Sequence, residues 1–246
     1  MEDTNKKFNK IPKTSKAVKI YYHVAQVGGW ESILNEQINL IHSTGLYNLC
    51  EDINVGFLGD LSCIEPYITG KIKLAVHDSN LKRFEAITIN KMLEHASNNV
   101  NQYDVLYIHT KGARGVIRND INGQYYWRQM MNYWMIEQHL TCIDYLRQDY
   151  ATCGINSIPK CNPTHYSGNF WWSSSDYIRN LSPLNETEGR GKSELWLLDN
   201  SEAKKYKHIS LYGPYLSSKP HASDSYGLYG MILERDDYIK SQINSF

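Results

Sequence analysis

The stretch that decides the fold is residues 103–114, YDVLYIHTKGAR, in which an apolar run ends in polar and basic residues. Residues 104–109 are mostly apolar, β-branched or aromatic, which predicts a strand. Residues 110–114 contain threonine, lysine, glycine and arginine, which predicts a loop. A strand that ends on histidine, threonine and lysine is unusual for a segment whose only role is packing. The loop is therefore a candidate functional site.

Strand and helix patterns alternate from the start of the chain up to this loop. The predicted strands are 17–24, 53–58, 72–76 and 104–109, and the predicted helices between them are 31–44 and 84–96. This βαβ spacing predicts a mainly parallel, doubly wound α/β sheet flanked by helices. In such sheets ligands bind at the carboxyl ends of the strands, near a topological switch point. The polar loops after the first, third and fourth predicted strands are therefore the candidate binding loops.

Beyond residue 114 the sequence predicts a second set of elements. These are a long helix over 124–147, strands at 151–155 and 205–212, and helical segments at 177–181 and 229–234. The long helix carries an apolar face for the core and Arg128, which can extend towards the preceding loop. Without an internal repeat or a long linker, the pattern favours one domain over 17–246 after a polar, lysine-rich lead-in at 1–16.

The composition narrows the function classes. Lys plus Arg and Asp plus Glu both number 26, so no net charge favours binding to nucleic acid or an anionic membrane. The five cysteines form no Cys-x-x-Cys pair, which favours reduced thiols and a cytoplasmic protein. No apolar run is long enough for a membrane span, and the lead-in lacks the apolar core of a signal peptide.

The loop after residue 109 has the chemistry of an anion site. Lys111, Arg114 and Arg118 place three cations beside Gly112 and Gly115. Exposed backbone N–H groups with nearby cations suit a phosphate or diphosphate. The loop is not a P-loop, because GxxxxGK[ST] is absent. A solvated basic loop is the alternative, and the position at a strand end favours the anion site.

A second unusual stretch is residues 165–172, HYSGNFWW. Trp171 and Trp172 are adjacent, so in a strand they point to opposite faces, and at least one is expected to meet something other than the central core. Gly168 lacks a side chain between Ser167 and Asn169, which can present hydrogen-bonding groups. Aromatic surface beside such groups suits a sugar, and the alternative is a packed aromatic corner.

Three single residues each allow two interpretations. Glu194 precedes an apolar segment and is either a catalytic base or a helix-start residue. His208 in the last strand is either a ligand or structural. Asp78 contacts a base or ribose, or caps the turn that follows it. No Asp-x-Asp occurs in the chain, and the Lys111 ammonium can supply part of the charge neutralisation that a metal ion would give.

Four segments in order resemble a known family. They are VLYIHTKGA (105–113), the helix with Trp-Arg, HYSGNFWW and SELWL (193–197). Together they are similar to a small family of glycosyltransferases found in bacterial polysaccharide clusters and giant viruses, and distantly similar to rhamnan-synthesis proteins. The segments YYHVAQ (21–26), GGW (28–30) and FEAITI (84–89) belong to the same resemblance, which covers about 19–212.

The resemblance implies a GT-A fold, with a nucleotide-binding half at about 17–120 and an acceptor half at about 121–246. It implies a nucleotide-sugar donor and a glycan or glycoprotein acceptor. The implied donor contacts are Tyr22, His23, Ala25, Asp78, His109, Thr110 and Lys111. The basic residues Arg114, Arg118 and Arg128 are added as candidate donor contacts by their own charge and position. The implied sugar and acceptor contacts are His165, Tyr166, Ser167, Gly168, Asn169, Trp171 and Trp172.

The implied chemistry is hexosyl or deoxyhexosyl transfer. Glu194 falls where inverting members of the fold place the base, and Lys111 lies beside the diphosphate. Mn²⁺ or Mg²⁺ is the candidate cofactor, with His109 and His208 as candidate contacts, although Asp-x-Asp is absent. The alternatives are a non-catalytic carbohydrate-binding protein on the same scaffold and a nucleotidyltransferase, which would need clustered carboxylates.

Overall fold

The computed structural model describes residues 16–114, 121–157, 165–185, 189, 191–212 and 235–239. The lead-in up to residue 15, Arg118 and the predicted helix at 229–234 lie outside these ranges. The described strands are β1 Ala17–Ala25, β2 Cys50–Leu58, β3 Ile72–Asp78, β4 Tyr103–His109, β5 Tyr150–Gly154, β6 Trp171–Ser174 and β7 Lys207–Ser210. The described α-helices are α1 Trp30–Ser43, α2 Leu46–Leu49, α3 Leu61–Ile64, α4 Ala86–Asn98, α5 Ile121–Asn132, α6 His139–Arg147, α7 Ser175–Ile178, α8 Gly191–Leu195 and α9 Arg235–Ile239.

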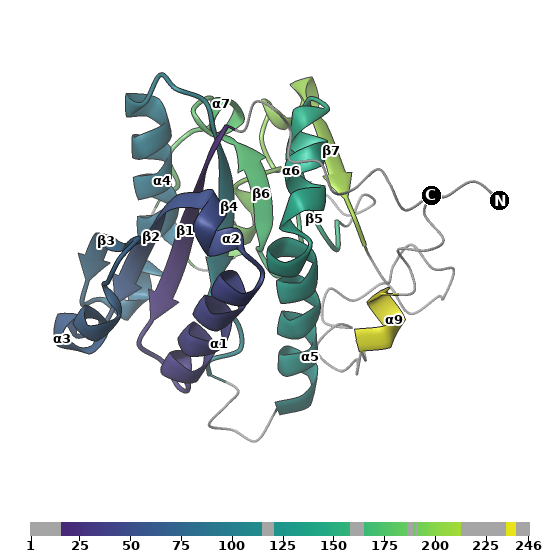
Figure 1. Cartoon of the computed structure of the whole chain (residues 1–246). Helices are drawn as coiled ribbons and strands as arrows, with labels where there is room; N and C mark the ends of the chain where they lie inside the picture. Colours follow the sequence, from purple (N-terminus) through teal and green to yellow (C-terminus); the bar gives the residue numbers. More distant parts are fainter. Residues whose placement is uncertain are drawn as a thin grey trace.

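The strands form one sheet in the order β3-β2-β1-β4-β6-β5-β7, with helices on both faces (Figure 1). Strands β1 to β4 are parallel, and the register of β1 and β4 places His23 beside His109 at their carboxyl ends. Strand β6 runs antiparallel to both β4 and β5. The sheet is mainly parallel and is flanked by helices in a single α/β domain, which confirms the fold class that the βαβ spacing predicts.

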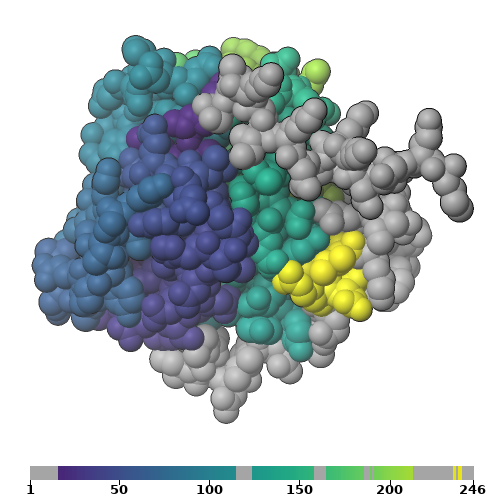
Figure 2. Space-filling view, viewed as in Figure 1, coloured from purple at the N-terminus to yellow at the C-terminus, as the bar shows by residue number. Residues whose placement is uncertain are grey.

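The alternation of side chains along the strands divides the core into two clusters. One cluster, which includes Tyr22, packs under α1 and α5, and the other, which includes Tyr21, packs under α4 and α7. Strand β4 is buried along its whole length because both of its faces are covered. The helix α9 lies against α5, as Figure 2 shows in yellow and teal, and Arg235 pairs there with Glu137.

The predicted single helix over 124–147 is interrupted. Between α5 and α6 the residues Tyr133–Glu137 form a π-helical segment, closed by a hydrogen bond from Gln138 N to Tyr133 O at 2.9 Å. In this segment the Met135 carbonyl accepts a hydrogen bond from Trp172 Nε1 at 2.8 Å. The wider turn thus gives a buried indole its partner, which a regular helix would have used for its own backbone.

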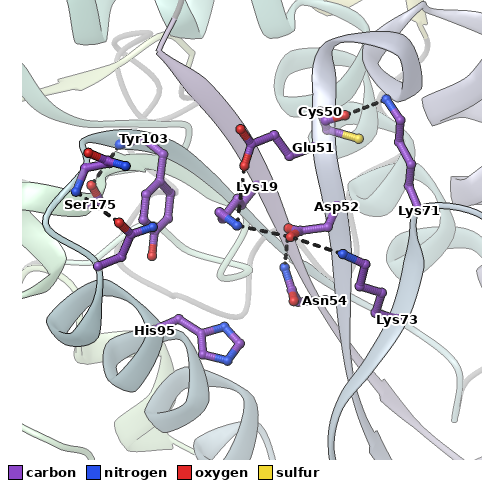
Figure 3. A network of polar contacts seen from close by, with 12 residues as sticks. Lys19, Cys50, Glu51, Asp52, Asn54, Lys71, Lys73, His95, Tyr103 and Ser175 are labelled. Carbon is purple, nitrogen blue, oxygen red and sulfur yellow. Dashed lines mark hydrogen bonds and ion pairs between the residues drawn. The ribbon is translucent and has the colours of Figure 1, made fainter.

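A polar network lies at the amino ends of β1 and β2, at the opposite end of these strands from the predicted binding loops (Figure 3). Asp52, only 8% exposed, accepts hydrogen bonds from Lys19 Nζ at 3.0 Å and Asn54 Nδ2 at 2.6 Å, and Lys73 Nζ lies 3.8 Å away. Burial opposes the charge of Lys19, but the contacts with Asp52 outweigh it and raise the pKa of the ammonium. The network therefore stabilises the sheet.

We expect Asp52→Asn to lower the free energy of unfolding by about 1–2 kcal/mol, because the amide cannot compensate the two lysines. Urea unfolding followed by circular dichroism measures this as a lower midpoint with an unchanged slope. The matched control is Glu51→Gln, since Glu51 is exposed and its contact with Lys19 is longer, at 3.5 Å. Equal midpoints for Asp52→Asn and the unaltered protein would contradict the stabilising role.

Candidate functional site

A cleft of about 300 Å³ lies at the carboxyl ends of β1 and β4. Strand β1 has β2 on one side and β4 on the other, so the cleft is at the point where the strand order reverses, which is where open α/β sheets bind ligands. Figure 1 shows the arrowhead of β1 pointing to this edge of the sheet. The predicted residues that line the cleft are His23, Ala25, His109, Thr110, Lys111 and Arg114.

The turn that carries Lys111 is held by the loop after β1. Thr110 N donates to His23 O at 3.1 Å, and Gly29 N donates to Ala113 O at 2.9 Å. Gly28 has φ +55°, and a Cβ there would lie 1.9 Å from Ala113 O. A side chain at position 28 would therefore push the two loops apart. The glycines of the QVGGW segment thus place the lysine turn against β1.

Lys111 is buried, with 6% of its surface exposed, although it lines the cleft. Its Nζ lies 4.2 Å from the ring centroid of Trp127, a cation–π contact that stabilises the ammonium where water is scarce. The aromatic face fixes the position of the charge at the wall of the cleft.

Arg128 holds the backbone of the turn that carries Lys111. Its Nη1 donates to the Lys111 carbonyl at 3.1 Å, and its Nε and Nη2 donate to the two carboxylate oxygens of Glu36 at 3.0 and 2.9 Å. Arg128 is not among the residues that line the cleft. The structure thus brings Arg128 to the predicted loop but turns its guanidinium towards Glu36, so it positions the backbone of Lys111 and is not placed to contact a ligand.

Glu85 is a cleft residue that the sequence reasoning did not single out. It is 9% exposed and accepts hydrogen bonds at Oε2 from Tyr107 at 3.1 Å and Asn169 Nδ2 at 2.5 Å. Its Oε1 lies 4.0 Å from His109 Nδ1. The preceding residue, Phe84, also lines the cleft and has φ 49°, a conformation that costs about 1–3 kcal/mol for a residue with a side chain. The sequence signal that could have pointed to Glu85 was its position just before α4, within the FEAITI segment.

Gly168 connects the first half of the chain to Glu194. Its N–H donates to Glu194 Oε1 at 2.5 Å, and its carbonyl accepts from His109 Nε2 at 3.0 Å. Gly168 has φ +96°, and a Cβ there would lie 2.4 Å from Met131 Sδ and 3.1 Å from the Trp127 ring. Only glycine fits, and it links the predicted base to the end of β4. Glu194 itself is half-buried on α8 and is not among the residues that line the cleft, which it reaches through Gly168 and His109.

Both tryptophans of HYSGNFWW are buried, which corrects the expectation that one of them meets something other than the core. Trp172 is 0% exposed in the cluster under α5, and Trp171 is 1% exposed on the other face, stacked on Tyr107 at 5.0 Å. Trp171 Nε1 donates to Asn169 Oδ1 at 2.8 Å. Strand β6 lies inside the sheet, so both of its faces are covered, and for the indoles the packed aromatic corner is confirmed.

The other residues of this segment hold the corner together. Tyr166 is buried, and its hydroxyl donates to Ile209 O at 2.9 Å and lies 2.8 Å from Thr152 Oγ1. Ser167 is buried in the turn, with its N–H donating to Asn156 O at 3.2 Å. His165 is half-buried.

Tyr22, Asp78 and His208 were also predicted as site residues, and none of them lines the cleft. Tyr22 is on the opposite face of β1 and donates to Gln37 Oε1 at 2.5 Å. Asp78 accepts from Asn80 N and Arg83 Nη1, both at 2.8 Å, as the capping interpretation predicts. These contacts with Asn80 and Arg83 hold the pKa of the Asp78 carboxyl below its usual value.

His208 is structural in this arrangement. Its Nε2 donates to Ala203 O at 2.7 Å, and its Nδ1 is hydrogen-bonded to Thr152 Oγ1 at 2.8 Å. Burial lowers the pKa of the imidazole. Both ring nitrogens are therefore engaged within the protein, and His208 does not line the cleft.

Within the described ranges, no three or more His, Cys, Asp or Glu side chains are grouped so that they could hold a metal ion. The histidines of the cleft have protein partners: His23 Nδ1 lies 2.8 Å from Thr88 Oγ1, and His109 Nε2 donates to Gly168. The same part of the chain contains no helix that is long and apolar enough to cross a membrane.

Burial of His23 predicts an acid-sensitive fold. Burial, with a smaller effect of the nearby His109, lowers the pKa of this imidazole from 6.5 to about 4, while Glu85 opposes the change. Between these values the unfolded chain binds a proton that the folded protein does not, so stability falls as the pH is lowered from 6.5 to 4. We expect this one group to remove up to about 3 kcal/mol.

The variant His23→Gln, which keeps a hydrogen-bonding group near Thr88, should flatten this part of the stability profile. Urea unfolding at several pH values measures the slope. His139 and His208 also have pKa values lowered by burial, so a smaller slope remains in the variant. Identical slopes for the variant and the unaltered protein would show that His23 is not the acid-sensitive group.

Comparisons with known proteins add a family. A search of curated proteins finds no match. Among solved structures, the fold is similar to a 4-diphosphocytidyl-2C-methyl-D-erythritol synthase from Anaerococcus prevotii DSM 20548, with 12% identity, coverage of 93% of this chain and 96% of that chain, and a TM-score of 0.46. It is also similar to a nucleotidyl transferase from Methanothermobacter thermautotroptrophicus, with 9% identity, coverage of 93% and 97%, and a TM-score of 0.46. Likeness at this level carries no inference about what the chain does.

The family model described as Domain of unknown function (DUF8361) matches residues 20–219, which include every cleft residue described above, and the protein belongs to this family.

Proposed function

We propose that the protein is a glycosyltransferase that moves a hexosyl or deoxyhexosyl group from a nucleoside diphosphate sugar to a hydroxyl of a glycan or glycoconjugate. The observation that carries the proposal is the cleft at the switch point of the sheet, with the Lys111 ammonium held over Trp127 at its wall. A buried ammonium at the wall of a cleft suits a diphosphate, whose charge must be balanced both in the bound donor and in the leaving group.

Lys111 binds the diphosphate in this mechanism and stabilises the charge that develops as the bond from the sugar to the phosphate oxygen breaks. Arg114 is exposed at the same cleft and adds a second positive charge at its mouth. Arg128 and Glu36 hold the Lys111 peptide in place. His23 and Ala25 form the wall on the β1 side.

Glu194 is the proposed base for a reaction that inverts the sugar. It takes the proton of the acceptor hydroxyl, the acceptor oxygen forms the new bond to the anomeric carbon, and the diphosphate leaves with the electron pair of the broken bond. The hydrogen bond from Gly168 N to Oε1 orients the carboxylate. A reaction that retains the configuration would not need a base at this position.

A divalent metal ion does not fit the donor set described here. Its usual oxygen ligands are carboxylates, and Glu85 is the one carboxylate among the described residues that line the cleft. In the proposed mechanism the Lys111 ammonium contacts the diphosphate directly and balances part of its negative charge. The carbohydrate-binding alternative relied on the aromatic surface of HYSGNFWW, and both of its tryptophans are buried.

A thermal-shift screen tests the proposal. The ligands are UDP-, GDP- and dTDP-sugars, each with Mn²⁺ and with EDTA, and a CMP-sugar, which carries a single phosphate, is the control. A ligand at 100 times its Kd stabilises the folded state by about 2.7 kcal/mol, which raises the melting temperature by several degrees. We expect stabilisation by the sugars of one base, followed by slow hydrolysis of that donor. If none of the three diphosphate donors raises the melting temperature in either condition, the proposed function is wrong.

A further inference from the structure

Only one oxygen of the Glu85 carboxylate accepts hydrogen bonds from the described residues. Its Oε2 is held by Tyr107 and Asn169, but no described residue donates a hydrogen bond to its Oε1, whose nearest basic group is His109 Nδ1 at 4.0 Å. The residue lines the same cleft as Lys111. Glu85 Oε1 is not among the fully buried side-chain atoms that lack a partner, so it keeps some exposure, and a ligand or water in the cleft can supply its donor.

The backbone around Glu85 fixes the direction of this oxygen. Its carbonyl accepts from Thr88 N and Ile89 N, both at 3.1 Å, which anchors it to the start of α4. On the other side, Phe84 has a positive φ that a residue with a side chain rarely adopts. Strain of this kind is found where a site needs a fixed geometry. The carboxylate is therefore held at both its backbone and its Oε2 before any ligand binds, as a specific hydrogen-bond acceptor requires.

Glu85 and Lys111 give the cleft two opposite charges. The positive charge suits the diphosphate, and the carboxylate suits groups that donate hydrogen bonds. In a nucleoside diphosphate sugar, hydroxyls of the ribose and of the transferred sugar lie on the two sides of the diphosphate. Only those of the sugar are missing from the nucleoside diphosphate, so comparing these two ligands distinguishes the two sets of hydroxyls. A sugar with its own carboxylate would bring a second negative charge next to Glu85, which is only 9% exposed, and repulsion between the two carboxylates is unfavourable.

We propose that Glu85 accepts hydrogen bonds from the hydroxyls of the donor sugar, and that it makes the site specific for uncharged sugars over uronic acids. This inference rests on the proposed function and names the class of donor. Glu85 thereby acts as a specificity-determining residue on the wall of the cleft, while Lys111 serves all donors through the diphosphate that they share.

Isothermal titration calorimetry tests the proposal with two matched ligand sets. They are UDP, UDP-glucose and UDP-glucuronate, and GDP, GDP-mannose and GDP-mannuronate. The quantity of interest is the ratio of the Kd of the uronate donor to the Kd of the neutral donor. The variant is Glu85→Gln, which keeps a carbonyl oxygen for Tyr107 and Asn169, and the matched control is Asp52→Asn, a carboxylate of similar burial at the other end of the sheet.

We expect the unaltered protein to bind the neutral donor at least about tenfold more tightly than the uronate, the size of one charge-assisted hydrogen bond. Glu85→Gln should lower this ratio about tenfold and change the Kd of UDP or GDP alone by less than about twofold. Asp52→Asn should leave the ratio unchanged. A role of Glu85 in folding alone would change the Kd of the diphosphate and of both donors together.

Two results overturn the inference while the proposed function stands: equal affinity of the unaltered protein for neutral and uronate donors, or an unchanged ratio in Glu85→Gln. If Glu85→Gln does not fold, the ratio measured with the unaltered protein decides alone. If the unaltered protein binds no member of either set, the inference fails, and the thermal-shift screen alone decides the proposed function.

Discussion

Replacing Lys111 with alanine is expected to weaken the binding of the nucleoside diphosphate by about 10- to 100-fold and to lower turnover by a further 10²- to 10³-fold, roughly. The binding loss follows from the removal of a charge-assisted contact in a cleft where the ammonium is 6% exposed. The expected loss of turnover is separate, because in the proposed mechanism the same charge also stabilises the departing diphosphate. The Kd of the diphosphate and the rate of donor hydrolysis measure the two effects.

The control for this variant is Lys91→Ala. Lys91 pairs with Glu94 on the exposed side of α4 and makes no contact with the cleft. It removes the same charge from the protein, so any long-range electrostatic effect is shared by both variants. Salt should weaken donor binding in the unaltered protein and in Lys91→Ala more than in Lys111→Ala. Unchanged turnover in Lys111→Ala would rule out this lysine as the diphosphate contact.

The second large effect is expected for Glu194→Gln. Turnover should fall by about 10²- to 10⁴-fold, the usual contribution of a general base, while the Kd of the donor stays the same. Glutamine retains an oxygen that can accept from Gly168 N, so the connection to His109 is preserved and the variant tests proton transfer alone. Single-turnover kinetics with saturating donor separates the chemical step from binding.

A matched control is Glu202→Gln, since Glu202 pairs with Lys205 on the surface of the same half of the chain. The anomeric configuration of the product, measured by NMR, gives the independent test. Inversion together with a slow Glu194→Gln supports the base. Retention, or near-normal turnover in Glu194→Gln, removes Glu194 from that role.

The first half of the fold could be predicted because its signals are local. The apolar runs of β1 to β4 and the helical periods of α1 and α4 each lie within one short segment. The π-helical segment could not be predicted, because it depends on the indole of Trp172 reaching the Met135 carbonyl. The burial of both tryptophans could not be predicted either, since a sequence does not show that β6 lies inside the sheet.

The candidate site also has features that could be predicted from the sequence and features that could not. The position of Lys111 at the end of a strand follows from the sequence, and the structure brings it to the cleft. The role of Arg128 does not follow, because its partner Glu36 lies on a different helix, far earlier in the chain. Glu85 was missed because its importance comes from the strained backbone at Phe84 and from Asn169, neither of which has a local pattern.

The position of β6 also decides whether the two halves of the chain can be separated. Strand β4 is fully buried and pairs with β1 on one side and with β6, from the second half, on the other. A chain truncated at about residue 120 would keep β4 but leave one edge and much apolar surface unpaired. Edges of this kind pair with other chains, so we expect the truncated protein to aggregate. We therefore do not expect the segment up to about residue 120 to fold on its own, and chimaeras between family members should exchange the loops around the cleft and keep the whole sheet intact.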